Sequence, residues 1–119
     1  MLINGRTALA AGGSNNNIFA GYIIEVMPAD GFLSFGFTTG DLAGITVADT
    51  EVDIICGMEI IANNFMPRAL GAAPQAPIIP DDFLLSCPAL AGDRIVGKVR
   101  NLDAANASAL YWTVILDES

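Results

Sequence analysis

Apolar residues alternate with small or polar ones along the segment Phe32-Leu33-Ser34-Phe35-Gly36-Phe37-Thr38-Thr39. Successive side chains of a β-strand point to opposite faces, so this alternation predicts a strand with one aromatic, core-facing side. A turn signal, Pro28-Ala29-Asp30-Gly31, precedes the segment, and the run before that turn, residues 18–27, is rich in β-branched and aromatic residues. The whole stretch therefore predicts a hairpin whose strands are 18–27 and 32–39.

Further strands are predicted along the rest of the chain, at 45–47, 52–62, 83–87, 94–102 and 109–116. A strand is favoured over a helix at 52–62 because isoleucine and valine dominate this run, and a bulge is expected at Gly57. No strand–helix alternation supports a parallel sheet. The predicted fold class is all-β, with an antiparallel β-sandwich or a jelly-roll-like barrel as its architecture.

Two segments lack the strand pattern. Residues 12–17, Gly-Gly-Ser-Asn-Asn-Asn, favour turns or flexible coil, so residues 1–17 are predicted to form a flexible N-terminal arm. Residues 63–82 contain prolines at 67, 74, 77 and 80 and show no periodicity, which predicts a long Pro-rich protruding loop. The remainder, 18–119, is predicted to be a single β domain.

The composition excludes several classes of function. Hydrophobic residues make up 53% of 119 residues, and a chain of this length has only a small core to fill, so a homo-oligomer is expected. The net charge is −8, and five Lys and Arg residues are too few to line a groove for phosphates, so neither nucleic acid nor a membrane is expected as a partner. No apolar run approaches ~20 residues and no signal-peptide pattern is visible, so synthesis in the cytoplasm is expected.

The residue types also argue against an enzyme. Histidine, the commonest general base at neutral pH, is absent, so no catalytic residues and no cofactors are predicted. Glu25 and Glu59 would form an acid–base pair only in a shared cleft, and their places in predicted strands favour solvent-facing sides. Residues 92–99 nearly match a phosphate-binding loop, but Val99 stands where Ser or Thr must hold magnesium.

Three carboxylates, Asp49, Glu51 and Asp53, would lie on one side of an extended segment and offer oxygen ligands to a divalent cation. The EF-hand pattern is not met, because Ile54 stands where glycine is required and Ile60 where the bidentate glutamate belongs. A hydrated turn is the favoured interpretation, and no metal site is predicted.

The two cysteines and the large aromatics are interpreted as core residues. Cys56 and Cys87 lie in apolar runs, which favours buried thiols in a reducing compartment, with a disulfide as the open alternative. Trp112 with Tyr22 and Tyr111 could form a sugar-stacking platform. Trp112 occupies the apolar register of its strand, however, so core packing is favoured.

Candidate partner contacts are apolar or cationic residues of the arm, the Pro-rich loop and one strand: Leu2, Ile3, Arg6, Leu9, Phe65, Met66, Arg68, Leu70, Arg94, Lys98 and Arg100. The last three hold most of the positive charge of the chain. They either pair with carboxylates of the same fold or form a docking stripe for an acidic partner.

The layout of an arm, a body of antiparallel strands, a Pro-rich excursion and a closing strand resembles small virion proteins. It is most similar to the decoration or cement proteins of tailed phages and to small jelly-roll capsid proteins. Residues 94–118, a strand, an Asn-containing turn and an aromatic strand, are similar in style to the closing hairpin of many phage structural proteins.

The resemblance implies a non-enzymatic protein made in the host cytoplasm and located in the virion, where it binds itself and a shell of major capsid protein. Cement proteins sit as trimers at quasi-threefold axes and stabilise the shell, so a homotrimer is implied here. The arm and the Pro-rich loop would then clamp neighbouring subunits. The alternative hypothesis is a carbohydrate- or receptor-binding β-sandwich module.

Overall fold

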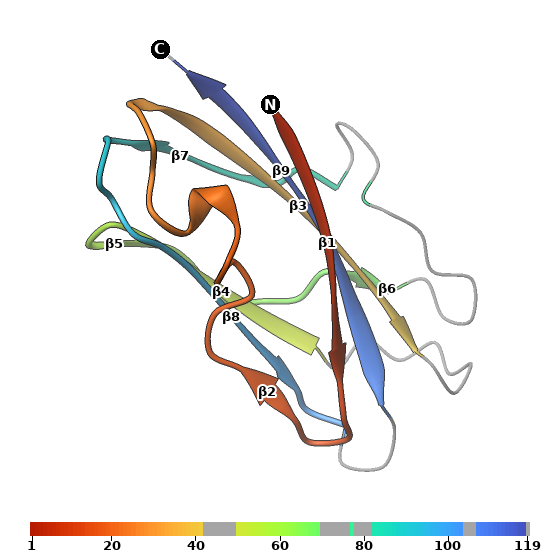
Figure 1. The fold of residues 1–119 in the computed structure, drawn as a ribbon. Coiled ribbons are helices and arrows are strands. Elements are labelled where there is room, and N and C mark those ends of the chain that lie inside the picture. The colour runs from red at the N-terminus through yellow and green to blue at the C-terminus, as the bar shows by residue number, and fades with distance from the viewer. Residues whose placement is uncertain (42–49, 70–76, 78–81, 104–106, 119) are drawn as a thin grey trace.

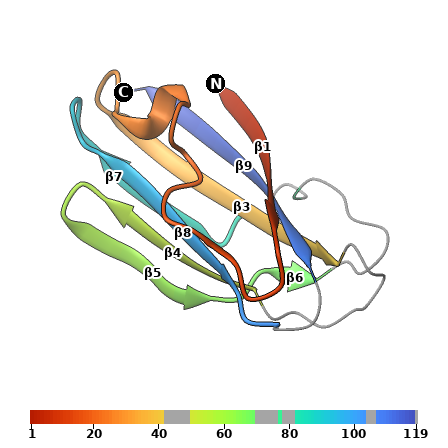
Figure 2. The same ribbon diagram turned by 60° about the horizontal axis from the view of Figure 1, so that its bottom comes forward.

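The computed structural model describes residues 1–41, 50–69, 77, 82–103 and 107–118, and their fold is all-β. One sheet has the strand order β1 (Leu2–Leu9), β9 (Ser108–Glu118), β3 (Gly31–Asp41) and β6 (Arg68–Ala69), and β7 (Leu85–Ala89) also pairs with β3. The second sheet has the order β2 (Ser14–Asn15), β8 (Ile95–Asn101), β4 (Thr50–Cys56) and β5 (Glu59–Phe65). The two sheets face each other (Figures 1 and 2), and their pairings are antiparallel except for β3 with β6.

The core lies between the sheets and is made by alternate residues of the long strands. Its fully buried members come from both sheets: Leu33, Phe35, Val52, Ile54, Ile95, Val99, Leu110, Trp112 and Val114. The alternation that predicted strands at 32–39, 94–102 and 109–116 is thus confirmed in β3, β8 and β9. The predicted strand 83–87 is confirmed in part by β7, whereas 45–47 lies outside the described residues.

The predicted strand at 18–27 is wrong. This segment contains turns and a short 3₁₀ helix, η1 (Ile23–Glu25), and it enters the space between the sheets. Ile18, Phe19, Ile24 and Met27 are all buried, and their spacing follows no two-residue period. Composition alone suggested a strand, but without alternation these side chains fill the core from several directions.

The predicted flexible arm is also wrong for its first half. Residues Leu2–Leu9 form β1, which pairs with β9 over its whole length, from Leu2 opposite Ile115 to Leu9 opposite Ser108. Ser14 and Asn15 then form β2 at the edge of the other sheet. The N-terminal segment therefore belongs to the fold and links one edge of each sheet.

Residues 52–62 form parts of two strands rather than one. Gly57 adopts a φ of +62°, a conformation that favours glycine, and the chain turns back so that Cys56 lies opposite Glu59. The ladder between β4 and β5 is irregular next to Ile54, not at Gly57. Of the predicted loop 63–82, Asn63–Phe65 belongs to β5 and Arg68–Ala69 to β6, and most of the remainder lies outside the described residues.

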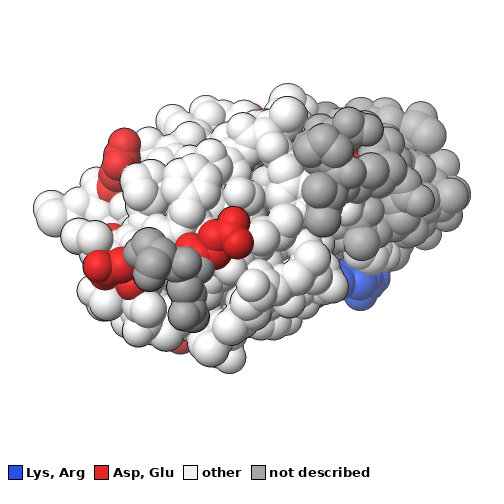
Figure 3. All heavy atoms as spheres, turned by 90° about the horizontal axis from the view of Figure 1, so that it is seen from above, with Lys and Arg blue, Asp and Glu red and all other residues white. Residues whose placement is uncertain are grey.

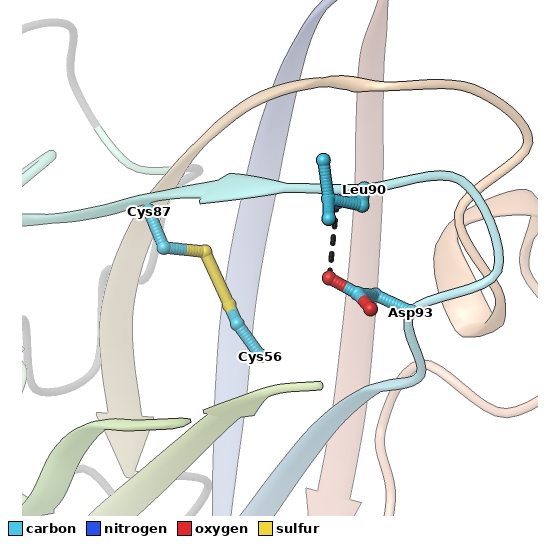
Figure 4. Close-up of a disulfide and its surroundings, with 4 residues drawn as sticks. All are labelled: Cys56, Cys87, Leu90 and Asp93. Atoms are coloured by element: carbon cyan, nitrogen blue, oxygen red, sulfur yellow. Dashed lines mark hydrogen bonds between the residues drawn. A yellow bond between two sulfur atoms is a disulfide. The ribbon is translucent and has the colours of Figure 1, made fainter. Parts of the chain in front are cut away.

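A disulfide joins Cys56 of β4 to Cys87 of β7, so the prediction of free thiols is wrong and its alternative is correct (Figure 4). Both cysteines are buried. Because β4 and β7 belong to different sheets, this bond links the two sheets covalently through the core.

Candidate functional site

An apolar groove lies where β3 begins and where β7 and β9 end, at the top of Figure 1. Its volume is about 490 Å³, and its walls and rim are formed by Asp30, Gly31, Phe32, Pro88, Ala89, Leu90 and Asp117. The strand register places Phe32 between Pro88 on one side and Asp117 on the other. Phe32 remains 45% exposed and Leu90 64% exposed, so large apolar surfaces face solvent at this site.

Hydrogen bonds hold the turn on one side of the groove. Asp93 Oδ2 accepts a hydrogen bond from the Leu90 amide at 3.0 Å, as Figure 4 shows, and Asp30 Oδ1 accepts one from the Ala91 amide at 2.8 Å. The exposed side chain of Leu90 is thus presented by a fixed backbone. A rigid apolar surface loses little conformational entropy when a partner binds to it.

The charge around the groove is acidic. Asp30 and Asp117 are the ionisable residues among its lining, and no described Lys or Arg lines it. Seen from above in Figure 3, this end of the molecule is mostly uncharged, carboxylates are scattered over it, and blue lies only at its margin. The groove is therefore suited to an apolar or weakly basic partner surface rather than to an anion.

More exposed apolar side chains gather beside Arg94. Val26 forms a β-bridge with Arg94, and the Gly57 amide donates to the Arg94 carbonyl at 2.9 Å, which places Met58 next to them. Val26 is half-exposed and Met58 is fully exposed. Arg94 itself lies 3.7 Å from Glu25 and keeps most of its side chain in solvent.

Arg100 is committed to an internal ion-pair network. Its Nη1 donates to Asp53 Oδ2 at 2.8 Å and its Nη2 to Asn64 Oδ1 at 2.6 Å, while Glu51 Oε1 lies at 3.4 Å. The backbone N–H of Asn64 also donates to Asp53 Oδ1 at 2.7 Å. The hydrogen bond from Arg100 is the main reason why the pKa of Asp53 is lowered, and the same contact raises the pKa of Arg100.

The network accounts for one of the three cations of the cationic strand, Arg100. Lys98 and Arg100 lie on the outward face of β8, and Lys98 pairs in register with Asp53. Arg100 pairs with carboxylates of the same chain, whereas Arg94 has only a 3.7 Å contact with Glu25 and Lys98 makes no ion pair within 4.0 Å with a described residue.

Two of the three carboxylates considered for metal binding form ion pairs with Arg100 instead. Glu51 and Asp53 face Arg100, and Asp49 lies outside the described residues. Within the described ranges, no group of three or more His, Cys, Asp or Glu side chains is placed to hold a metal ion. Glu25 accepts a hydrogen bond from the Gly21 amide, Glu59 lies exposed at the start of β5, and neither lines the groove.

The aromatic platform considered for sugar binding is not assembled. Trp112 is 1% exposed, and Phe19 and Tyr22 contact it edge-on with ring centroids at 5.0 and 4.8 Å. Tyr111 lies on the other face of β9, where Arg6 Nε donates to its hydroxyl at 3.2 Å. The prediction that Trp112 packs in the core is confirmed.

The structure separates the predicted partner-contact residues. On β1, Leu2 and Arg6 are exposed, Ile3 packs against the core and Leu9 is buried in it. Phe65 packs against Phe37 with the ring centroids 6.3 Å apart, and Met66 is half-exposed.

Two of the predicted contacts fall at or beyond the limit of the described residues. Arg68 lies in β6, with its side chain outside the described part, and Leu70 lies outside it altogether.

The groove residues were missed by the sequence analysis. The detectable signal was Phe32, which lies out of phase with Leu33, Phe35 and Phe37 and so had to face outward. Pro88 and Asp117 join Phe32 only through the register of three strands, which the sequence does not reveal.

The chain matches no protein-family model, and no curated protein is significantly similar to it in sequence. In the described part of the chain, no helix is long and apolar enough to cross a membrane.

Proposed function

We propose that this chain is a non-enzymatic structural protein of a virion, which decorates or cements a capsid as a homo-oligomer. In this proposal the two facing sheets form an antiparallel β-sandwich, and the shell of major capsid protein is the second partner. The observation that carries it is the apolar groove with Phe32 and Leu90 exposed on its walls. A surface of this kind is typical of protein–protein contacts.

The polar groups of the described residues favour a structural role over a chemical one. The polar contacts hold strands and turns in place, as Asp93 holds the turn at Leu90 and Arg100 holds β8 to β4. The inter-sheet disulfide between Cys56 and Cys87 adds stability without a ligand. A cementing protein needs resistance to mechanical and thermal stress, and contacts of this kind would contribute to it.

The test is sedimentation of the purified protein with capsids of the virus that encodes it. We expect saturable binding in proportion to the number of capsid subunits, and we expect bound capsids to lose their shell integrity at a higher temperature. Failure to bind either DNA-filled or empty capsids would overturn the proposal.

Matched variants distinguish specific binding through the groove from nonspecific hydrophobic binding. Phe32→Ser and Leu90→Ser remove apolar side chains from the groove and should weaken capsid binding at least tenfold. Ile60→Ser removes an equally exposed apolar side chain from β5, outside the groove, and should bind as the unchanged protein does. Equal loss with all three variants would mean that the groove has no special role.

A further inference from the structure

β1 is an outer strand with one unpaired edge. It pairs with β9 on one side, and no other described strand pairs with it (Figure 1). The Met1 amino group donates to the Leu116 carbonyl at 2.8 Å, and the Leu116 amide donates back to the Met1 carbonyl at 2.8 Å. In an antiparallel ladder, residues that exchange two hydrogen bonds with the partner strand alternate with residues whose N–H and C=O groups point away from that strand. Leu2, Asn4, Arg6 and Ala8 therefore direct their backbone groups toward the open side of β1.

This edge lacks three of the devices that normally prevent strands from pairing with other chains, which are proline, bulges and short length, and it carries a single charge, that of Arg6. β1 has eight residues, no proline and an unbroken register with β9. By contrast, β7 contains Pro88, and the ladder of β5 is irregular and includes Asn64 with a φ of +58°. β2 and β6 have two residues each, so β1 is the one long, regular outer strand among those described.

The charge of β1 also favours contact with another copy of this acidic chain. β1 contains one cation, Arg6, and no carboxylate, although the whole chain has a net charge of −8. The Arg6 guanidinium lies 5.7 Å from the centre of the Tyr111 ring, so it covers the face of the sheet and leaves the edge open. Two copies that meet along β1 avoid the repulsion that carboxylate-rich surfaces would produce.

The sequence of β1 is complementary to itself in one antiparallel register. If Gly5 of each copy lies on a two-fold axis, Leu2 pairs with Ala8 of the second copy and Asn4 pairs with Arg6 of the second copy. All four outward-directed residues of each strand are then paired, which gives about eight new backbone hydrogen bonds. Asn4 and Arg6 of the second copy are then opposite each other, with their side chains still held by Thr113 and Tyr111 of their own β9, and Leu2 lies opposite Ala8.

We propose that the free edge of β1 is a self-association surface, on which β1 of a second copy pairs antiparallel about a two-fold axis. The sheets of the two copies then form one continuous sheet with the order β3-β9-β1 followed by β1-β9-β3 of the second copy. The resemblance to cement proteins implied a trimer, whereas a two-fold contact makes a dimer the basic unit. The inference rests on the homo-oligomer of the proposed function and specifies its contact.

Light scattering on a sizing column, over a range of concentrations, measures the assembly without any capsid. We expect a dimer for the unchanged protein and for Ala8→Ser, which keeps the backbone N–H. Ala8→Pro removes that outward N–H without removing a bond to β9, so we expect at least tenfold weaker association. A protein that is monomeric at the highest concentration, a trimer without dimers, or an Ala8→Pro dimer as tight as the unchanged one would overturn the proposal.

Hydrogen exchange separates loss of the contact from loss of the strand. The amides of Ile3, Gly5 and Thr7 point to β9 and should stay protected in every folded variant, whereas those of Asn4, Arg6 and Ala8 should be protected only at concentrations where the dimer forms. If Ala8→Pro also exposes Thr7, Arg6→Glu replaces it as the test, because a carboxylate on the edge should weaken the dimer in a salt-dependent way. Fast exchange at Asn4 and Ala8 at high concentration would contradict the proposed pairing.

The two proposals fail separately. A monomer that still sediments with capsids would refute the β1 contact and the homo-oligomer, and it would leave capsid binding in place. A β1 dimer that binds no capsid would refute the virion role and leave the contact in place.

Discussion

The indole ring of Trp112 in β9 lies against the backbone of Gly5 in β1, directly opposite in the ladder, and leaves no room for a side chain there. A Cβ atom on Gly5 would lie 2.8 Å from the indole Nε1 and would overlap the benzo ring. Phe19 and Tyr22 contact the same indole edge-on. The glycine is what allows an edge strand to close over the largest side chain of the core.

Gly5→Ala should therefore destabilise the protein by about 1–3 kcal/mol, because the indole or β1 has to move. The measurement is urea unfolding. Trp112→Phe removes the overlapping atoms, and the indole Nε1 it deletes has no hydrogen-bond partner among the described residues. The double variant should cost less than the sum of the two single changes, and an additive result would show that Gly5 and Trp112 do not contact each other.

The alternation of β3 predicts opposite effects at two adjacent positions. Leu33 is fully buried, so Leu33→Ala should cost about 2–5 kcal/mol of unfolding free energy. Phe32 faces the groove, and Phe32→Ala should cost no more than about 1 kcal/mol. Thermal or urea unfolding of the two variants checks this, and equal costs would show that the strand register is shifted.

Reduction should destabilise the protein strongly. The disulfide between Cys56 and Cys87 spans 31 residues of sequence, and closing such a loop removes about 3–4 kcal/mol of chain entropy from the unfolded state. Unfolding midpoints measured with and without reductant should differ by a corresponding amount. A variant with both cysteines replaced by alanine provides the control, because reductant should leave its midpoint unchanged.

Acid should weaken the link between β4 and β8. The Arg100 hydrogen bond lowers the pKa of Asp53 in the folded state, so the folded protein binds fewer protons than the unfolded chain at acidic pH. This stabilisation is complete above roughly pH 4 and is lost as the pH falls through the folded pKa of Asp53.

Asp53→Asn should cost about 1–2 kcal/mol at pH 7 and should reduce the acid dependence of unfolding. Glu59→Gln is the matched control, because Glu59 is an exposed carboxylate at the start of β5 and makes no ion pair within 4.0 Å with a described residue. An Asp53→Asn variant with the acid dependence of the unchanged protein would show that the Arg100 contact is not formed in solution.

Sequence patterns predicted the fold where the two faces of a strand differ clearly. In β3 and β9, large apolar residues alternate with small or polar ones, so both strands and their core faces were predictable. β1 was missed because Asn4, Arg6 and Ala8 alternate with Gly5 and Thr7, which are hardly more apolar. Its partner β9 also lies at the other end of the chain, and local patterns carry no information about such a pairing.

At β1 a strand was not predicted, whereas at 18–27 a strand was predicted that the structure does not contain. Its composition is typical of a strand, yet Ile18, Phe19 and Ile24 are buried at an irregular spacing because they enter the core from loops and η1. The candidate site was predictable only in its chemical character. An excess of apolar residues indicated a contact surface, whereas the meeting of Phe32, Pro88 and Asp117 depends on strand register.

Two backbone hydrogen bonds join Met1 to Leu116, and their position makes the molecule easier to unfold by force in one direction than in others. These residues end the ladder between β1 and β9, so a force that draws them apart loads the backbone hydrogen bonds one after another rather than all together. β1 would peel away from its first residue onward. The bond between Cys56 and Cys87 lies in other strands, so it does not hold β1 in place.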